Sequence, residues 1–242
     1  MQIQPLIDDL KQLRLEGMAE ALQQQADVPN SASLSFEDRL QSLILAEQSS
    51  KDAKRFQRLM RAAKLKIAAN PEDIVYTPDR GLDKSEMASL LRLDWVRQGR
   101  NVLVTGATGT GKTWIACCFG VQAARFGLRV AYRRVNRMLE DMEIGHDDGT
   151  LAKQRNQLAK SDLLILDDFG LTPLTPIGRS DLLEVLDDRV GSGATIIAGQ
   201  MPVKNWHAYI EDPAIADAIM DRVSHNGTRL TLSGSSMRGR ES

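Results

Sequence analysis

The sequence NVLVTGATGTGKT at residues 101–113 decides the fold of this chain. Its first apolar residues form a short buried strand, and residues 106–113 match the pattern G-x-x-x-x-G-K-[ST] at every fixed position. Glycines let backbone N–H groups turn toward a phosphate, and the helix that follows directs its positive end at the same group. The segment therefore predicts a nucleoside triphosphate site, in preference to a glycine-rich turn that binds nothing.

Individual positions of this phosphate loop have predicted roles. Lys112 is expected to reach the β- and γ-phosphates, and the hydroxyl of Thr113 to hold Mg²⁺, so ATP and Mg²⁺ are the expected cofactors. The residues predicted to contact the nucleotide are Gly106, Ala107, Thr108, Gly109, Thr110, Gly111, Lys112, Thr113 and Trp114.

A second motif, LLILDD at residues 163–168, predicts a buried strand that ends in two carboxylates. Open parallel sheets bind ligands at the carboxyl ends of their strands, where both acids would lie. We expect Asp167 to hold Mg²⁺, directly or through water, and Asp168 to orient or polarise the attacking water. An isolated LLILDD could be an ordinary strand end, but its combination with the phosphate loop favours catalysis.

A further strand is predicted at residues 194–198 and ends just before Gln200. Gln200 is the predicted contact to the γ-phosphate or to the attacking water, and the alternative is an amide that only caps the backbone. Residues 128–132 predict another strand, and residues 228–232 a fifth with alternating polarity. His146 lies beside two aspartates, but adjacent residues lack metal-ligand spacing, so residues 145–149 are predicted to be a loop.

The part before residue 70 is predicted to be helical. Residues 5–26 have apolar side chains at helical spacing, with Gly17 weakening the middle, and a second helical stretch continues from residue 36 to about residue 69. The sequence also allows a break in this second helix at Ser49 and Ser50. We therefore expect a helical domain at residues 1–69, which binds DNA or a partner, and a nucleotide-binding domain at residues 70–242.

The segment 51–66 carries seven basic side chains and one acid, Asp52. Five of the bases fall on one helical stripe suited to following a phosphate backbone, although a solvated face or an acidic protein partner would also explain them. The predicted DNA contacts are Lys51, Lys54, Arg55, Arg58 and Arg61. A second positive surface, or plain solvation, is predicted for Arg133, Arg134, Arg137, Lys153, Arg155 and Lys160.

The composition of the chain limits the classes of protein to which it can belong. The formal net charge of −1 gives no overall indication of nucleic-acid binding. Cys117 and Cys118 are adjacent, which disfavours an ordinary disulfide and suits packing in a reducing compartment. Apolar runs are too short to cross a membrane, and the N-terminus does not resemble a signal peptide, so a soluble cytoplasmic protein is expected. Ile74 and Tyr76 could line an adenine pocket or belong to the core.

The whole pattern resembles the AAA+ ATPases, and most closely the clade of DnaA-type initiators, DnaC-type helicase loaders and IstB transposition helpers. Within that clade it is similar to the IstB-like proteins. The residues that carry the likeness are GATGTGKTWIA at 106–116, LLILDDFG at 163–170, GQMPVKNWHAYIEDPAIADAIMDRVSHN at 199–226 and SSMR at 235–238. The resemblance implies an α/β fold, with a doubly wound five-stranded parallel sheet flanked by helices and preceded by a small all-α domain.

The same resemblance implies how the protein works. Arg222 matches an arginine finger that reaches the γ-phosphate of a neighbouring subunit, which requires a homo-oligomer, and Arg238 is a candidate second phosphate sensor. The alternative for Arg222 is a salt bridge near its own helix. The implied function is an ATPase that assembles on duplex DNA, without reading sequence, and regulates or recruits the transposase of the same insertion element. A replicative helicase loader is the alternative, and a small-molecule kinase is disfavoured because no acceptor-binding lid is evident.

Overall fold

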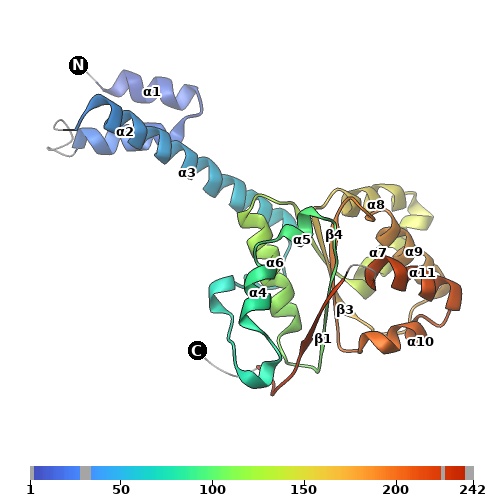
Figure 1. Ribbon diagram of the computed structural model, residues 1–242. Helices are drawn as coiled ribbons and strands as arrows, with labels where there is room; N and C mark the ends of the chain where they lie inside the picture. Colours follow the sequence, from blue (N-terminus) through green and yellow to red (C-terminus); the bar gives the residue numbers. More distant parts are fainter. Residues whose placement is uncertain (1–2, 28–33, 225–226, 238–242) are drawn as a thin grey trace. The chain divides into compact units, whose positions relative to one another are not determined.

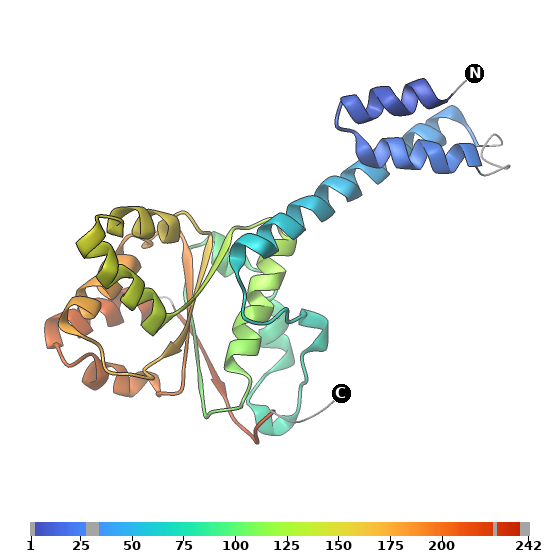
Figure 2. The same cartoon turned by 180° about the vertical axis from the view of Figure 1, so that it is seen from behind.

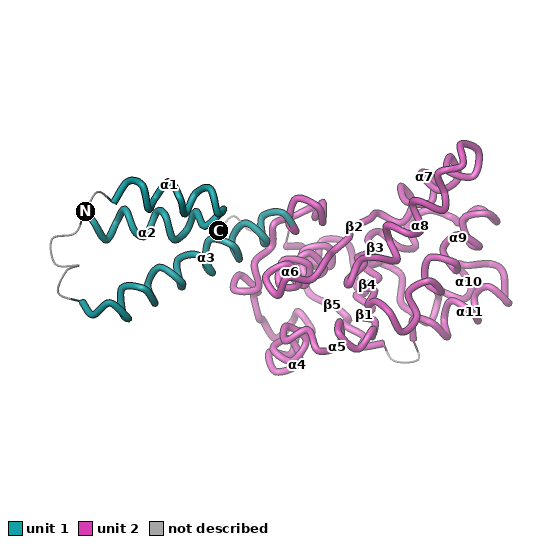
Figure 3. The backbone as a smooth tube through the Cα atoms, turned by 90° about the horizontal axis from the view of Figure 1, so that it is seen from above, with its two compact units in different colours: residues 1–58 teal, residues 59–242 magenta. Residues whose placement is uncertain are grey.

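The computed structural model describes residues 3–27, 34–224 and 227–237. The chain forms two compact units, Met1–Arg58 and Leu59–Ser242, and the boundary between them falls within one helix (Figure 3). The first unit is helical, and the second contains the sheet and the whole phosphate loop. No helix in the described part of the chain is long and apolar enough to cross a membrane.

The first unit begins with a helical hairpin, where a single helix was predicted. α1 covers Gln4–Gln12 and α2 covers Glu16–Asp27. Between them Arg14 has a φ of 60°, and the Leu15 N–H donates to the Leu10 carbonyl at 2.8 Å. This pattern ends a helix through its own backbone, although glycine usually takes the left-handed position. The prediction of one helix over residues 5–26 is therefore wrong.

Gly17 allows close helix packing in this unit. A Cβ at this position would lie 2.6 Å from the Ala46 carbonyl oxygen of α3, which covers Phe36–Ala63. The Met18 N–H donates to Glu47 Oε2 of α3 at 3.1 Å, and Glu47 is buried. The helix α3 is continuous through Ser49 and Ser50, so no break occurs there. It ends at Ala63, earlier than predicted, where Lys64 takes a φ of 52°.

The second unit contains the predicted five-stranded parallel sheet (Figure 1). Its strands are β1 (Val102–Gly106), β2 (Val130–Arg134), β3 (Leu163–Phe169), β4 (Ala194–Gly199) and β5 (Thr228–Leu232). They lie in the order β2-β3-β4-β1-β5, and every neighbouring pair is parallel. The strand that carries the two carboxylates is thus separated from the phosphate-loop strand only by β4.

Helices cover both faces of this sheet (Figure 2). Alternate residues of each strand enter different cores, so that Val102 and Val104 lie in one core and Leu103 in the other. This double burial explains the uninterrupted apolar runs of the strands. One face packs on α4 (Lys84–Leu90), α5 (Asp94–Arg97) and α6 (Lys112–Arg125). The other packs on α7 (Val135–Asp148), α8 (Leu151–Ala159), α9 (Pro176–Asp187), α10 (Trp206–Ile210) and α11 (Pro213–Ser224). Short 3₁₀ helices form at Pro71–Asp73, Pro78–Arg80 and Val203–Asn205.

The predicted loop at residues 145–149 is wrong because α7 continues to Asp148 and ends at Gly149, whose φ is 76°. His146 lies in the last turn of α7, and its Nε2 is 3.0 Å from Asp181 Oδ1 of α9. Among the residues that the structure describes, no group of three or more His, Cys, Asp or Glu side chains could hold a metal ion. His146 therefore joins two helices that cover the sheet.

Candidate nucleotide-binding site

The phosphate loop lies at the carboxyl end of β1, and its glycines are required by its backbone. Gly106 has a φ of 151°, and a Cβ there would lie 2.2 Å from the Leu232 carbonyl oxygen of β5. Gly111 begins α6 with a φ of 95°. Both are conformations that a side chain would strain. Thr110 is buried and donates through Oγ1 to the Ala107 carbonyl at 2.9 Å, which fixes the curve of the loop.

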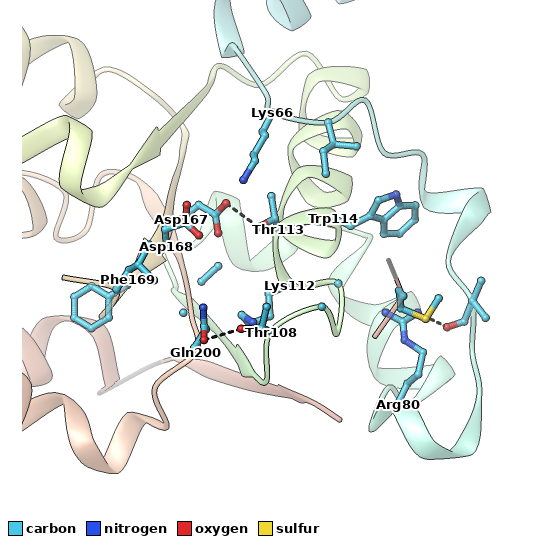
Figure 4. Close-up of a pocket in the computed structure, with 18 of the residues that line it drawn as sticks. Lys66, Arg80, Thr108, Lys112, Thr113, Trp114, Asp167, Asp168, Phe169 and Gln200 are labelled. Atoms are coloured by element: carbon cyan, nitrogen blue, oxygen red, sulfur yellow. Dashed lines mark hydrogen bonds between the residues drawn. The ribbon is translucent and has the colours of Figure 1, made fainter. Parts of the chain in front are cut away.

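A cavity of about 890 Å³ adjoins this loop (Figure 4). The Lys112 ammonium lies at its wall and donates to the Ala107 carbonyl at 2.8 Å. Trp114, on the first turn of α6, also lines the cavity, and its contact with a nucleotide stays a prediction. The phosphate-loop side chains and the ends of β3 and β4 therefore meet around one space large enough for a nucleotide.

The two predicted metal-holding residues lie together although they are far apart in the sequence. Thr113 Oγ1 donates to Asp167 Oδ2 at 2.8 Å, and the Asp167 side chain is only 2% exposed. A hydroxyl beside a buried carboxylate offers the oxygen ligands that Mg²⁺ prefers. The donor set therefore fits a magnesium ion held by Thr113 and Asp167.

Tyr132 is a neighbour of Asp167 that the sequence analysis did not identify. Its hydroxyl donates to Asp167 Oδ2 at 2.7 Å from the adjacent strand β2. Burial, together with this carboxylate, raises the pKa of Tyr132 well above its ordinary value. The phenol therefore stays protonated and keeps donating, which orients the Asp167 side chain that also accepts from Thr113. The only sequence signal was the position of Tyr132 near the carboxyl end of a predicted strand.

Asp168 enters the same cavity because the backbone departs from regular strand geometry. Successive side chains of a strand point to opposite faces, so adjacent acids would normally separate. Here Asp168 has a φ of 61°, and the register between β3 and β4 shifts between Leu166 and Phe169. Figure 4 shows Asp167 and Asp168 at the same wall of the cavity. Asp168 Oδ2 accepts from Arg134 Nε at 2.9 Å, an ion pair that the sequence did not indicate.

Gln200 lies directly after β4, between the strands of the phosphate loop and the carboxylates. Its Oε1 accepts from Thr108 Oγ1 at 2.8 Å, so the amide contacts the phosphate loop itself (Figure 4). The cavity is also lined by Gln200, which leaves its amide nitrogen within the same space. The arrangement is compatible with the predicted contact to the γ-phosphate or to water.

The other end of the cavity is more apolar and suits a purine base. Val75, Ile67 and Met237 line it together with Trp114. Neither Ile74 nor Tyr76 lines it, because both pack in the core beneath the sheet face that α6 covers. The extended backbone alternates its side chains, so Val75 between them faces the cavity instead.

Arg80 is a second residue that the sequence analysis missed. It is 4% exposed, and its guanidinium donates to the Thr110 carbonyl at 3.2 Å and to the Val75 carbonyl at 2.7 Å. Arg80 therefore supports the phosphate loop from below and joins it to the segment that lines the base end of the cavity. A buried guanidinium that bonds backbone carbonyls has no local motif, so only the fold reveals it.

Arg222 does not lie in this cavity. Its Nε donates to Asp187 Oδ1 at 2.6 Å, and its carbonyl accepts from Asn101 Nδ2 at the amino end of β1. The cavity is at the opposite, carboxyl end of the strands, so Arg222 cannot reach a nucleotide bound in its own subunit. Arg222 therefore has an ion pair, but with α9 and not within its own helix region, and a role in a neighbouring subunit stays a prediction. Arg238 lies outside the described residues.

The five predicted DNA contacts are exposed on α3, but two of them have acidic partners. Lys51 Nζ lies 3.3 Å from Glu47 Oε1, and Lys54 pairs with Glu16 of α2. The acids that the segment lacks in sequence are thus supplied by the preceding turn and by another helix. Both lysines are exposed, although Glu47 is buried, so their ammonium groups stay accessible to phosphates. DNA contact through the stripe stays a prediction.

Three of the six bases of the predicted second positive surface pair with acids, and for exposed Lys153 and Lys160 the surface stays a prediction. Arg134 pairs with Asp168, and Arg155 lies 2.7 Å from Glu184 and 3.0 Å from Asp188. Arg133 donates to its neighbour's carbonyl and Arg137 lies 3.7 Å from Glu140. These bases therefore serve mainly contacts within the second unit.

Comparison with known proteins places this geometry in a family. Residues 8–242 match the family model described as IstB-like ATP binding protein. The chain is 49% identical over 203 residues to an insertion sequence IS1162 ATP-binding protein of Pseudomonas fluorescens, covering 84% of this chain and 88% of the relative. It is 40% identical over 234 residues to the insertion sequence ATP-binding protein y4pL of Sinorhizobium fredii, covering 97% and 96%.

Solved structures of the DnaC and DnaI type share the fold. A DnaC helicase loader superposes with a TM-score of 0.56 at 17% identity, covering 69% of this chain and 97% of that one. The DnaI structure gives a TM-score of 0.59 at 15% identity, covering 73% and 94%. The AAA+ fold predicted from the sequence is therefore confirmed. This chain belongs to the IstB-like ATP-binding protein family.

Proposed function

We propose that this protein is a magnesium-dependent ATPase that assembles on duplex DNA and serves the transposase of its insertion element. The observation that carries the ATPase part is the hydrogen bond of 2.8 Å between Thr113 of the phosphate loop and the buried Asp167. It brings the predicted metal-holding groups together beside Lys112 and Asp168. The insertion-sequence names of the two relatives support the transposition part.

The residues of the cavity have separable roles in this proposal. Lys112 and the loop amides bind the phosphates, and Thr113 and Asp167 hold Mg²⁺, which supplies positive charge to neutralise the transferred phosphoryl group. Asp168 orients and polarises the attacking water, while Arg134 fixes the direction of its carboxylate. Gln200, attached to Thr108, adds an amide at the γ-phosphate end.

The DNA part of the proposal predicts ATP-dependent sedimentation with long duplex DNA of arbitrary sequence. We expect large complexes with ATP, which are lost with ADP and after the triple change of Lys51, Arg55 and Arg58 to Glu. Reversing three charges on one stripe removes several phosphate contacts, and affinity should fall by about 100-fold or more at low salt.

A matched control reverses three exposed bases of the second unit that lie outside both predicted positive surfaces, Lys84, Arg100 and Lys204, and changes the net charge by the same amount. This variant should sediment with DNA like the unchanged protein. Hydrolysis of ATP without duplex binding would contradict the proposal. It would favour the function of a helicase loader, which is the function named for the DnaC structure that shares this fold. Equal losses in both triple variants would mean that only total charge matters.

Arg222 is predicted to act on the nucleotide of a neighbouring subunit. Arg222→Ala should lower the ATPase rate about 100-fold or more, because an arginine supplied across an interface stabilises the transition-state charge. Mixing Arg222→Ala with Asp168→Asn should restore activity, since mixed assemblies contain interfaces with an intact site and an intact arginine. The steady-state rate of the mixture, compared with that of each variant alone, is the measurement.

Two controls separate this role from the ion pair with Asp187. Asp187→Asn removes the pair but keeps the guanidinium, and it should retain most of the activity. Arg229→Ala removes an exposed arginine of β5 and should have little effect. Absence of any recovery in the mixture would show that Arg222 does not act between subunits.

A further inference from the structure

Lys66 is the last base of the segment 51–66, and it enters the nucleotide cavity from outside the two nucleotide-binding motifs. It belongs to the short segment that follows α3, yet it lines the cavity together with Thr113, Asp167 and Asp168. Figure 4 shows its side chain extended toward Asp167 and Thr113, on the side of the cavity across from the phosphate loop. A cation therefore faces the place where the γ-phosphate and Mg²⁺ are expected.

The segment that carries Lys66 is fixed on α6, the helix that follows the phosphate loop. Lys64 turns the chain with a φ of 52°, and Leu65 packs on Gly120, where an added Cβ would lie 2.8 Å from Leu65 Cδ2. The backbone amides of Ile67 and Lys66 lie close to the Cys117 thiol; burial raises the pKa of that thiol, and the two amides oppose the rise.

This attachment determines where Lys66 can reach. Cys117 lies one helical turn after Thr113, so the two residues share a face of α6. The backbone of Lys66 is therefore placed about one turn above the threonine that is expected to hold Mg²⁺. A lysine side chain extends roughly one helical turn and reaches the end of the triphosphate from there.

Nearby carboxylates already have other partners. Asp167 accepts from Thr113 and Tyr132, and Asp168 accepts from Arg134. Within the described residues, no carboxylate oxygen lies within 4.0 Å of the Lys66 ammonium, although two acids line the same wall. Its charge is thus directed into the cavity without being neutralised by a protein acid, which suits an anionic ligand.

We infer that Lys66 binds the terminal phosphate of ATP held in its own subunit, and that it makes the chain just after α3 sensitive to the difference between ATP and ADP. This inference rests on the proposed ATPase function. ADP lacks the terminal phosphate, so the ammonium would have no phosphate at that position. Because only two residues separate Lys66 from the last residue of α3, nucleotide state would act on the end of the helix that carries the basic stripe.

The test compares the affinities of the purified protein for a non-hydrolysable ATP analogue and for ADP, both with Mg²⁺. Lys66→Gln should weaken the analogue about tenfold, the loss expected for one charge-assisted hydrogen bond, and leave ADP within about twofold. Lys66→Arg should keep the ratio of the two affinities near that of the unchanged protein. Lys64→Gln is the matched control, because Lys64 is exposed nearby and does not line the cavity.

Each outcome is decisive. An analogue-to-ADP ratio unchanged in Lys66→Gln, or a parallel loss of both affinities, would overturn the role of Lys66 while leaving the proposed ATPase intact. An equal effect of Lys64→Gln would show that the affinity depends on the positive charge of this segment in general and not on a specific contact of Lys66. Failure of the unchanged protein to bind either nucleotide would instead overturn the proposed function, and the inference with it.

Discussion

Asp168→Asn is expected to lower the ATPase rate about 1,000-fold while leaving the affinity for ATP within about threefold. The carboxylate lies at the wall of the cavity but outside the Thr113–Asp167 pair, so its loss affects water activation more than binding. Single-turnover hydrolysis and a separate binding titration would distinguish these effects. The change is well suited to the site because Asn tolerates the left-handed backbone that Asp168 adopts, with its φ of 61°.

Asp188→Asn provides the matched control for this prediction. Asp188 is also an aspartate paired with an arginine, Arg155, but it lies outside the cavity. Its substitution should change the rate by less than about twofold. If Asp168→Asn kept more than a tenth of the activity, another group would have to orient the water, and Gln200 would be the first to test.

The sheet could be predicted because each strand is encoded by a local feature of the sequence, a continuous run of apolar residues. Strands buried on both faces need continuous apolar runs, and LLILDD or NVLVTG supplies them within a few residues. The ends of the helices were harder to predict from the sequence. Arg14 takes a φ of 60° without being glycine and divides a helix that was predicted as one. Leu93, with a φ of 61°, separates α4 from α5 in the same way. The backbone hydrogen bonds that form at these turns cannot be recognised from the sequence.

The residues of the candidate site likewise fall into those that the sequence predicts and those that only the fold reveals. Thr113, Asp167 and Gln200 were predicted from motifs, and the structure brings them to one cavity because parallel strands end at one edge. Tyr132 and Arg134 were missed as partners of the carboxylates, since only the pairing of β2 with β3 brings them there. Lys66 and Arg80 come from segments whose place depends on packing against α6 and the phosphate loop, and no local pattern encodes that packing.

Arg189 marks the largest expected effect on stability, at the sheet edge away from the cavity. Its guanidinium is 2% exposed and donates to the carbonyls of Leu158, Ser161 and Ala194 at 2.6, 3.0 and 2.6 Å. Nε donates to Thr195 Oγ1 at 3.1 Å. Burial lowers the pKa of Arg189 to about 10, so the group stays charged near neutral pH.

Arg189→Met should therefore lower the free energy of unfolding of the second unit by about 2–4 kcal/mol. Methionine fills similar volume and avoids a buried charge, but it removes the guanidinium donor from three buried carbonyls. The Leu158 carbonyl keeps the N–H and the hydroxyl of Ser161 as donors. The loss at the carbonyls of Ser161 and Ala194 exceeds the relief of desolvation. Urea unfolding followed by tryptophan fluorescence reports on this unit, because all three tryptophans lie in it. Arg155→Met, which removes only the partly exposed pairs of Arg155 with Glu184 and Asp188, should cost less than about 1 kcal/mol. Equal, small losses in the two variants would show that water can replace the guanidinium. A selective loss in Arg189→Met, with nucleotide affinity retained below the transition, would show that the carbonyls at the amino edge of the sheet stabilise the unit independently of its site.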